Sequence, residues 1–251
     1  MNSLVQTGEV WTLPLPTLAG PPVSVLQHTA SIVTGLAVAS GGSRLVSCDR
    51  DEKVRISQWP TTCLIDAFCL GHTEYVAAVA MAHTTHASPN GEVLVSISGD
   101  GSLRCWDPVS GACLAMHAFP DNAVPVALAT SHANATETAA ATSGRVAVAF
   151  AGSATVAVLG LGGLAEKETG TKDGGDHAAN TLSVSEVTLP SVPSALAFDP
   201  SGNLLALSDN APYLHTIDCS SEKDGASLVA TPRALATALA STMEEHNLKV
   251  G

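Results

Sequence analysis

Three polar residues of one short stretch are of the types that a hydrolytic triad uses. His72, Ser96 and Asp100 could serve as base, nucleophile and orienting acid, because a histidine held by a carboxylate can accept the proton of a serine hydroxyl. Together with Trp106, the same residues can instead build a structural network, which fixes one strand register when every buried polar group is satisfied. The choice depends on the elements that carry these residues.

Other candidate sites are weaker. His83 and His86 have the spacing of metal ligands, but no cysteine or acid cluster lies near them in sequence, and a structural zinc site needs four ligands. We interpret them as exposed loop histidines and predict no metal site. The six cysteines contain no CxxC pair and are interpreted as structural thiols. No GxGxxG, P-loop or GxSxG motif occurs, so we predict no catalytic residue, no bound cofactor and no enzymatic activity.

A small group of cations stands out in an otherwise acidic chain. Arg50, Lys53 and Arg55 all lie within Cys48–Ser57. Lys53 and Arg55 are two positions apart, so on a strand they point to the same side. They could bind an acidic partner, or they could belong to a solvated hairpin tip whose alternating charges pair in part with one another. The residues alone favour neither interpretation.

Short strand-like runs separated by turn signals dominate the chain. Val93–Ser98 is followed by an Asp-Gly turn and then by Ser102–Trp106, which is the pattern of a strand, a tight turn and a second strand. Weaker pairs of the same kind follow at Arg145–Phe150 with Thr155–Leu159, and over Ser194–Leu207. The pattern predicts an all-β fold in which successive strands form hairpins.

The hairpins repeat with a period in the forties. His28 and His72 are 44 residues apart, and the turn acids Asp51 and Asp100 are 49 apart. A Gly-His opening and a Trp-Asp close at such a period are the signature of WD40 propeller blades. The full signature spans Gly71–Asp107, so we expect its histidine, serine, acid and tryptophan to meet as a structural tetrad inside one blade.

The preceding unit keeps only part of this set. His28, Ser47 and Asp51 are present, but Ser57 takes the place of the tryptophan. We therefore expect an incomplete tetrad there.

The repeat divides the chain into the units of an incomplete ring of about four to five blades. We expect the end of a truncated blade at 1–22, a WD blade at 23–66, a WD blade with the full signature at 67–118, a degenerate blade at 119–163, a flexible insertion at 164–186, a blade at 187–231 and a helical tail at 232–251. Ala and Leu in the tail suit a short C-terminal helix. Because an incomplete ring leaves sheet edges unpaired, we expect a partial gene product, with an atypical closure of the ring as the alternative.

The charge balance limits the partners. The 251 residues include 11 basic and 23 acidic side chains, for a net charge of −12, whereas a protein that grips phosphates normally presents a basic patch. We therefore expect no DNA binding. No stretch reaches 18 uninterrupted apolar residues, so no membrane span is expected. The N-terminus has neither the positive nor the apolar region of a signal peptide, which makes the cytosol or nucleus the default compartment.

Three segments are more specific than a bare Gly-His/Trp-Asp pair. They are DRDEKVRIS at Asp49–Ser57, FCLGHTEYV at Phe68–Val76 and SGDGSLRCWDPVSG at Ser98–Gly111. In order and spacing they resemble the WD-repeat non-catalytic subunit of the eukaryotic tRNA (guanine-N7-)-methyltransferase. The similarity extends over about Val5–His117, and beyond it the match is architectural only.

The resemblance implies a seven-bladed propeller that holds and activates a separate, Rossmann-like catalytic subunit in a heterodimer. That partner would bind S-adenosylmethionine and form N7-methylguanosine (m7G46) in the tRNA variable loop, so that tRNA is contacted mainly through the partner. In the family, basic residues of this hairpin pair with acidic residues of the catalytic subunit. Carried over, these are Lys53 and Arg55, with Arg50 as a further candidate.

The resemblance also implies a compartment, namely the nucleus, with the cytoplasm as a second one. A rival function class stays open, which is a generic WD40 scaffold in a ubiquitin-ligase or chromatin complex. Co-purification of a methyltransferase would distinguish the two classes.

Overall fold

The structure is a computed structural model of the whole chain. The residues that it describes are 8–13, 20–28, 31–84, 91–120, 123–131, 144–164, 182–210, 214–219 and 230–232. Most of the predicted insertion at 164–186 and, apart from its first residue, the predicted helical tail at 232–251 lie outside these ranges.

The described strands form five antiparallel sheets in which each strand pairs with its neighbours in sequence. The half-blade consists of β1 (Glu9–Thr12) and β2 (Val23–Gln27). The first blade consists of β3 (Val33–Val38), β4 (Arg44–Asp49), β5 (Val54–Gln58) and β6 (Ile65–Cys69). The second consists of β7 (Val76–His83), β8 (Glu92–Ser98), β9 (Ser102–Trp106) and β10 (Cys113–Ala118).

Two further blades complete the described part. The third blade consists of β11 (Pro125–Thr130), β12 (Arg145–Phe150), β13 (Thr155–Gly160) and β14 (Ser183–Thr188). The fourth consists of β15 (Pro193–Phe198), β16 (Leu204–Ser208), β17 (Leu214–Ile217) and β18 (Ala230–Pro232). A short 3-10 turn, η1 (Ser40–Gly42), joins β3 to β4. Among the described residues, no helix has the length and apolar character needed to cross a membrane.

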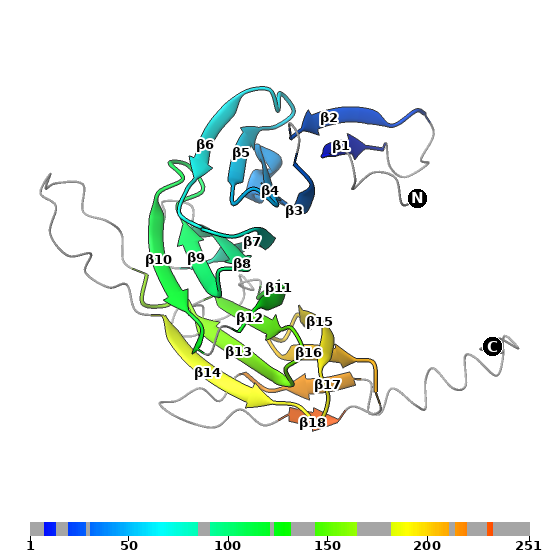
Figure 1. Cartoon of the computed structure of the whole chain (residues 1–251), viewed down its shortest axis with the longest axis vertical. Coiled ribbons are helices and arrows are strands. Elements are labelled where there is room, and N and C mark those ends of the chain that lie inside the picture. The colour runs from blue at the N-terminus through cyan, green and yellow to red at the C-terminus, as the bar shows by residue number, and fades with distance from the viewer. Residues whose placement is uncertain are drawn as a thin grey trace, which may run out of the picture.

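The sheets stand side by side along an arc (Figure 1). The first strands of the complete blades, β3, β7, β11 and β15, lie on its inner side, and β6, β10 and β14 lie on its outer side. The arc runs from the half-blade to the fourth blade, and the described strands leave it open. The prediction of an all-β WD40 propeller is confirmed.

Two strands belong to other sheets than the units expected from the sequence suggest, whereas the unit 67–118 contains the complete second blade. β2 pairs with β1 rather than with the first blade, so the unit 23–66 gives its first strand to the half-blade. β14 likewise pairs with β13 and lies partly inside the expected insertion at 164–186. Both strands are the last of their sheets, where the chain leaves one blade for the next, so the place of a unit boundary decides to which blade such a strand is assigned.

The hydrophobic core lies between the blades. Val46, Val54 and Ile56 of the first blade belong to one cluster with Leu94 and Trp106 of the second, and all five side chains are fully buried. Similar apolar layers join the second blade to the third and the third to the fourth. Because side chains alternate along a strand, one set faces the preceding blade and the other faces the following blade.

Strand pairing makes the blades comparable position by position. Ser47 pairs with Arg55 in the first blade, and Ser96 pairs with Arg104 in the second. Arg55 and Arg104 therefore hold equivalent positions, on the face that looks toward the preceding blade.

Candidate functional site

The structure brings the four predicted tetrad residues together in the second blade. His72 lies in the loop after β6, and its Nδ1 is 2.9 Å from Asp100 Oδ2. Its Nε2 is 2.7 Å from Ser96 Oγ, which also accepts the Trp106 Nε1–H at 2.8 Å. The His72 and Trp106 rings meet edge to face, with centroids 5.9 Å apart. A loop between blades is thereby tied to both strands of the next hairpin.

These contacts define one arrangement of protons. Ser96 Oγ accepts the indole N–H, so its own proton is donated to His72 Nε2, and His72 Nδ1–H is donated to Asp100. Burial lowers the pKa of His72, although Asp100 opposes the shift, so the neutral imidazole is favoured. Ser96 and Trp106 are fully buried and His72 is nearly so. A hydroxyl that is buried and already engaged on both sides is not a nucleophile, and the arrangement acts as structure.

Asp100 is held by further donors outside the predicted tetrad. Ser102 Oγ donates to its Oδ1 at 2.6 Å, and the backbone N–H of Thr73 donates to its Oδ2 at 3.1 Å. Burial alone would raise the pKa of this carboxyl, but the hydrogen bonds from Ser102, His72 and Thr73, together with the charge interaction with His72, outweigh burial and lower the pKa. The signal for Ser102 was its place directly after the Asp-Gly turn.

A related network in the first blade uses a different acid from the expected one. His28 Nδ1 is 2.8 Å from Asp49 Oδ2, and its Nε2 is 2.7 Å from Ser47 Oγ. The prediction of Asp51 was wrong, because Asp51 is exposed in the turn and only its backbone N–H takes part, as a donor to Asp49 Oδ1. Asp49 ends β4 and also accepts the backbone N–H of Lys53. The acid thus caps its own hairpin turn, which equal spacing between repeats could not reveal.

The three predicted partner-binding cations have different surroundings. Arg50 and Lys53 are exposed in the turn between β4 and β5. Arg55 lies inside β5 and is only partly exposed, so the expectation of a hairpin-tip residue does not describe it. Its Nε donates to Ser57 Oγ at 2.9 Å and its Nη2 donates to the carbonyl oxygen of Thr62 at 2.8 Å.

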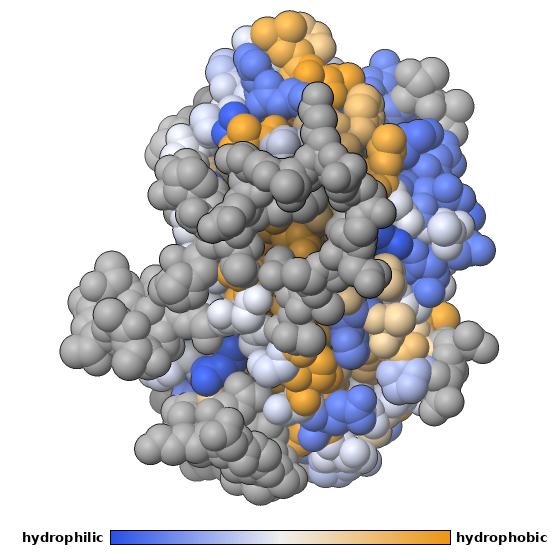
Figure 2. Space-filling view, turned by 90° about the vertical axis from the view of Figure 1, so that its left-hand side faces the viewer, coloured by the Kyte–Doolittle hydropathy of each residue, from blue (hydrophilic) through white to orange (hydrophobic). Residues whose placement is uncertain are grey.

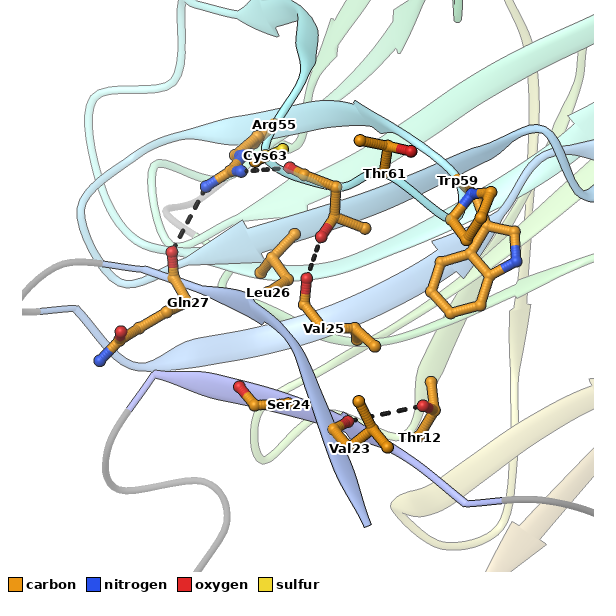
Figure 3. Close-up of a pocket in the computed structure, with 12 residues that line it drawn as sticks. Thr12, Val23, Ser24, Val25, Leu26, Gln27, Arg55, Trp59, Thr61 and Cys63 are labelled. Atoms are coloured by element: carbon orange, nitrogen blue, oxygen red, sulfur yellow. Dashed lines mark hydrogen bonds between the residues drawn. The ribbon is translucent and has the colours of Figure 1, made fainter.

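Arg55 also borders a groove of about 660 Å³ between the half-blade and the first blade. Figure 3 shows its guanidinium directed at the carbonyl oxygen of Gln27. The guanidinium also donates to the carbonyl oxygen of Thr62, and Thr62 Oγ1 donates to the carbonyl oxygen of Val25. Trp59 lines the other side of the groove. The groove is thus a seam where the loop before β6 is hydrogen-bonded to β2, and Arg55 is part of that seam.

The remaining candidates do not gather into a site. The prediction of an exposed loop histidine was wrong for His83, which ends strand β7 and is only partly exposed. His86 lies outside the described residues. The described ranges contain no group of three or more His, Cys, Asp or Glu side chains that could hold a metal ion. Burial raises the pKa of Cys48 to about 11 and that of Cys69 to about 12, which keeps these thiols protonated and unreactive.

The chain is similar to several known proteins. A family model described as "tRNA methyltransferase TRM82 WD40 domain" matches residues 21–199. The "tRNA (guanine-N(7)-)-methyltransferase non-catalytic subunit wuho" of Drosophila yakuba is 33% identical over 119 residues, which are 47% of this chain and 26% of that protein. The protein of the same name from Anopheles gambiae is 40% identical over 90 residues, which are 36% of this chain and 22% of that protein.

The matched part thus spans about a quarter of the curated relatives' length. Among solved structures, that of the computationally designed Ika4 protein aligns at 18% identity with a TM-score of 0.49, over 73% of this chain and 89% of that one. The family match covers more than half of the chain and contains the first three blades. The chain therefore belongs to the TRM82 WD40-domain family.

Proposed function

We propose that this chain is a non-catalytic WD-repeat subunit that binds and supports the catalytic subunit of a tRNA (guanine-N7-)-methyltransferase. The observation that carries the proposal is the family match over residues 21–199, together with relatives that are named as the non-catalytic subunit of that enzyme. The proposed role is to hold the partner in its active form for m7G46 formation in the tRNA variable loop.

The buried polar chemistry of the chain is compatible with this division of labour. His72, Ser96 and Asp100 are engaged with one another and with neighbouring donors, so in this proposal the chain supplies no catalytic group. S-adenosylmethionine would bind the catalytic subunit. The net charge of −12 is unfavourable for gripping a phosphate backbone, so tRNA would be held mainly through the partner, with no role for DNA or a membrane.

The turn between β4 and β5 is the proposed docking point. Of six described cations, four lie in the first blade: Arg44, Arg50, Lys53 and Arg55. Arg44 is paired with Asp66 at 2.8 Å, and Arg55 is tied to the seam. Lys53 and Arg50 are therefore the cations that are best placed to meet carboxylates of the catalytic subunit.

The test is co-expression of this chain with the catalytic subunit, followed by co-purification and by methylation of tRNA transcripts. Lys53→Glu should weaken binding, because it sets like charges against each other in the interface. The matched control is the pair Ala151→Glu and Thr155→Glu, which changes the net charge equally at the corresponding hairpin of the third blade. If the wild-type chain captures no methyltransferase, the proposal fails and the generic scaffold becomes the better account.

The nucleus is the proposed compartment, with the cytoplasm as a second one, because tRNA methylation places the chain where its partner acts. A fluorescent fusion tests this directly. Strict exclusion of the fusion from the nucleus would contradict the assignment.

A further inference from the structure

The outer strand of the first blade and the residues directly before and after it carry exposed apolar side chains. Leu64, Ile65, Phe68 and Leu70 are 51%, 42%, 43% and 67% exposed, and we call these four residues the β6 patch. Figure 2 shows apolar surface at the upper end of the molecule, where Figure 1 places β6 and the loop that precedes it. Contiguous exposed apolar surface of this kind often marks an interaction site.

Two residues of the β6 patch, Phe68 and Leu70, lie close in register to the cation Lys53. Arg55 pairs with Phe68 between β5 and β6. Continuing this register by two residues sets Lys53, directly before β5, opposite Leu70, directly after β6. Residues that lie opposite each other on antiparallel strands share a face and can act together. Among the described residues Lys53 has no ion-pair partner, so its charge is available beside two apolar side chains.

The fold does not require apolar residues at these two positions. In the third blade, the position of Phe68 is held by Glu186 and that of Leu70 by Thr188, and both are exposed. In the second blade, the position of Phe68 is held by Met116, which is 54% exposed although a complete blade precedes it. The exposure of Phe68 is therefore not caused by the incomplete half-blade that precedes it. Polar residues at these positions are compatible with the sheet.

We propose that Phe68, Leu70 and Lys53 form one docking surface for an acidic segment of the methyltransferase subunit that presents an apolar side chain next to a carboxylate. This inference rests on the proposed function and adds to it the apolar part of the contact. The charge pattern selects the partner, because the chain is acidic overall while its described cations concentrate in the first blade. The apolar pair would lose its water on docking, and Lys53 would set the orientation.

The experiment uses two variants that copy a neighbouring blade, so that folding is retained. Phe68→Glu and Leu70→Thr introduce the residues that the third blade carries at these positions. The double variant, co-expressed with the catalytic subunit, should bind about tenfold or more weakly, as expected for the loss of a central apolar contact. Met116→Glu makes the same change at the equivalent position of the second blade and should bind like the wild type.

The dependence of affinity on salt separates the two parts of the surface. Lys53→Gln should reduce the slope of log Kd against log salt, because it removes a charge. Leu70→Thr should weaken binding at every salt concentration and leave the slope unchanged. If the wild type binds and the double variant binds with the same affinity, this inference is overturned and the proposed function stands. No binding by the wild type would overturn both.

Discussion

Ser57 of β5 stands at the position that Trp106 holds in β9 of the next blade. In the second blade the indole N–H is donated to the network serine, and the guanidinium of Arg104 lies 5.8 Å over the tryptophan ring. In the first blade the equivalent Arg55 turns its Nε–H to Ser57 Oγ instead. Arg55 thus donates to the residue that stands in place of the tryptophan, and not to the network serine Ser47.

Removal of this arginine should destabilise the fold. Arg55→Gln would leave Ser57 Oγ and the carbonyl oxygen of Thr62 without their donor, which costs about 1–3 kcal/mol for buried groups. Urea unfolding measures the loss. Lys53→Gln, at an exposed turn position, should change the stability by less than about 0.5 kcal/mol. Equal midpoints for the two variants would show that the seam does not depend on Arg55.

The two acids of the β4–β5 hairpin should behave differently. Asp49→Ala would leave His28 Nδ1 and the backbone N–H groups of Asp51 and Lys53 without their acceptor, so we expect the melting temperature to drop. Asp51→Ala removes an exposed carboxylate and should leave it nearly unchanged. Thermal unfolding of both variants decides the point, and a larger drop for Asp51→Ala would contradict the observed network.

Stability should fall as the solution becomes acidic. Burial lowers the pKa of His72 below the 6.5 of a free histidine, so the unfolded chain takes up a proton there before the folded chain does. The folded state therefore loses stability as the pH falls below about 6.5. Asp100 acts in the same direction at lower pH. Its pKa is lowered from 3.8, so its ionised form stabilises the folded state, and this stabilisation is lost as the pH falls below 3.8.

The contribution of His72 can be isolated. In His72→Gln, the decline in the urea midpoint between about pH 6.5 and pH 5 should be shallower than in the wild type, although the absolute stability is lower. Parallel curves for the two proteins would assign the decline to other groups.

Gly111 should be less replaceable than Gly152. Both have positive φ angles, 71° and 67°, so alanine costs about 1–2 kcal/mol of backbone strain at either position. A Cβ on Gly111 would also lie 2.9 Å from the carbonyl oxygen of Phe68, whereas one on Gly152 meets nothing within 4 Å. Gly111→Ala should therefore unfold at lower urea than Gly152→Ala. Indistinguishable midpoints would rule out a tight contact between the β9–β10 turn and β6.

The repeat period and the strand alternation were sufficient to predict the hairpins. Val93–Ser98 and Ser102–Trp106 are strands with the expected turn between them, because local turn chemistry and periodicity act within a few residues. The same spacing logic failed at Asp51. Spacing counts residues, whereas the network depends on which carboxylate lies beside His28 once the turn has closed.

The role of Arg55 could not be predicted for a related reason. Its partners are backbone carbonyl oxygens of Gln27 and Thr62, which carry no signature in the amino-acid sequence. Only the packing of the half-blade against the first blade brings them within reach. The residues Lys53 and Arg50, by contrast, are exposed as a charged turn would suggest.

The order of strands within each sheet bears on how the chain acquires its structure. Every described pairing joins strands that are consecutive in sequence. In the first and second blades the connecting loops are also short, so these sheets can form with little loss of chain entropy. Folding can then start at any blade and spread to its neighbours, as in a linear array. The second blade carries the complete histidine–serine–aspartate–tryptophan network and lies between two complete blades. It would therefore be the natural folding nucleus, from which ordering proceeds toward both ends of the arc.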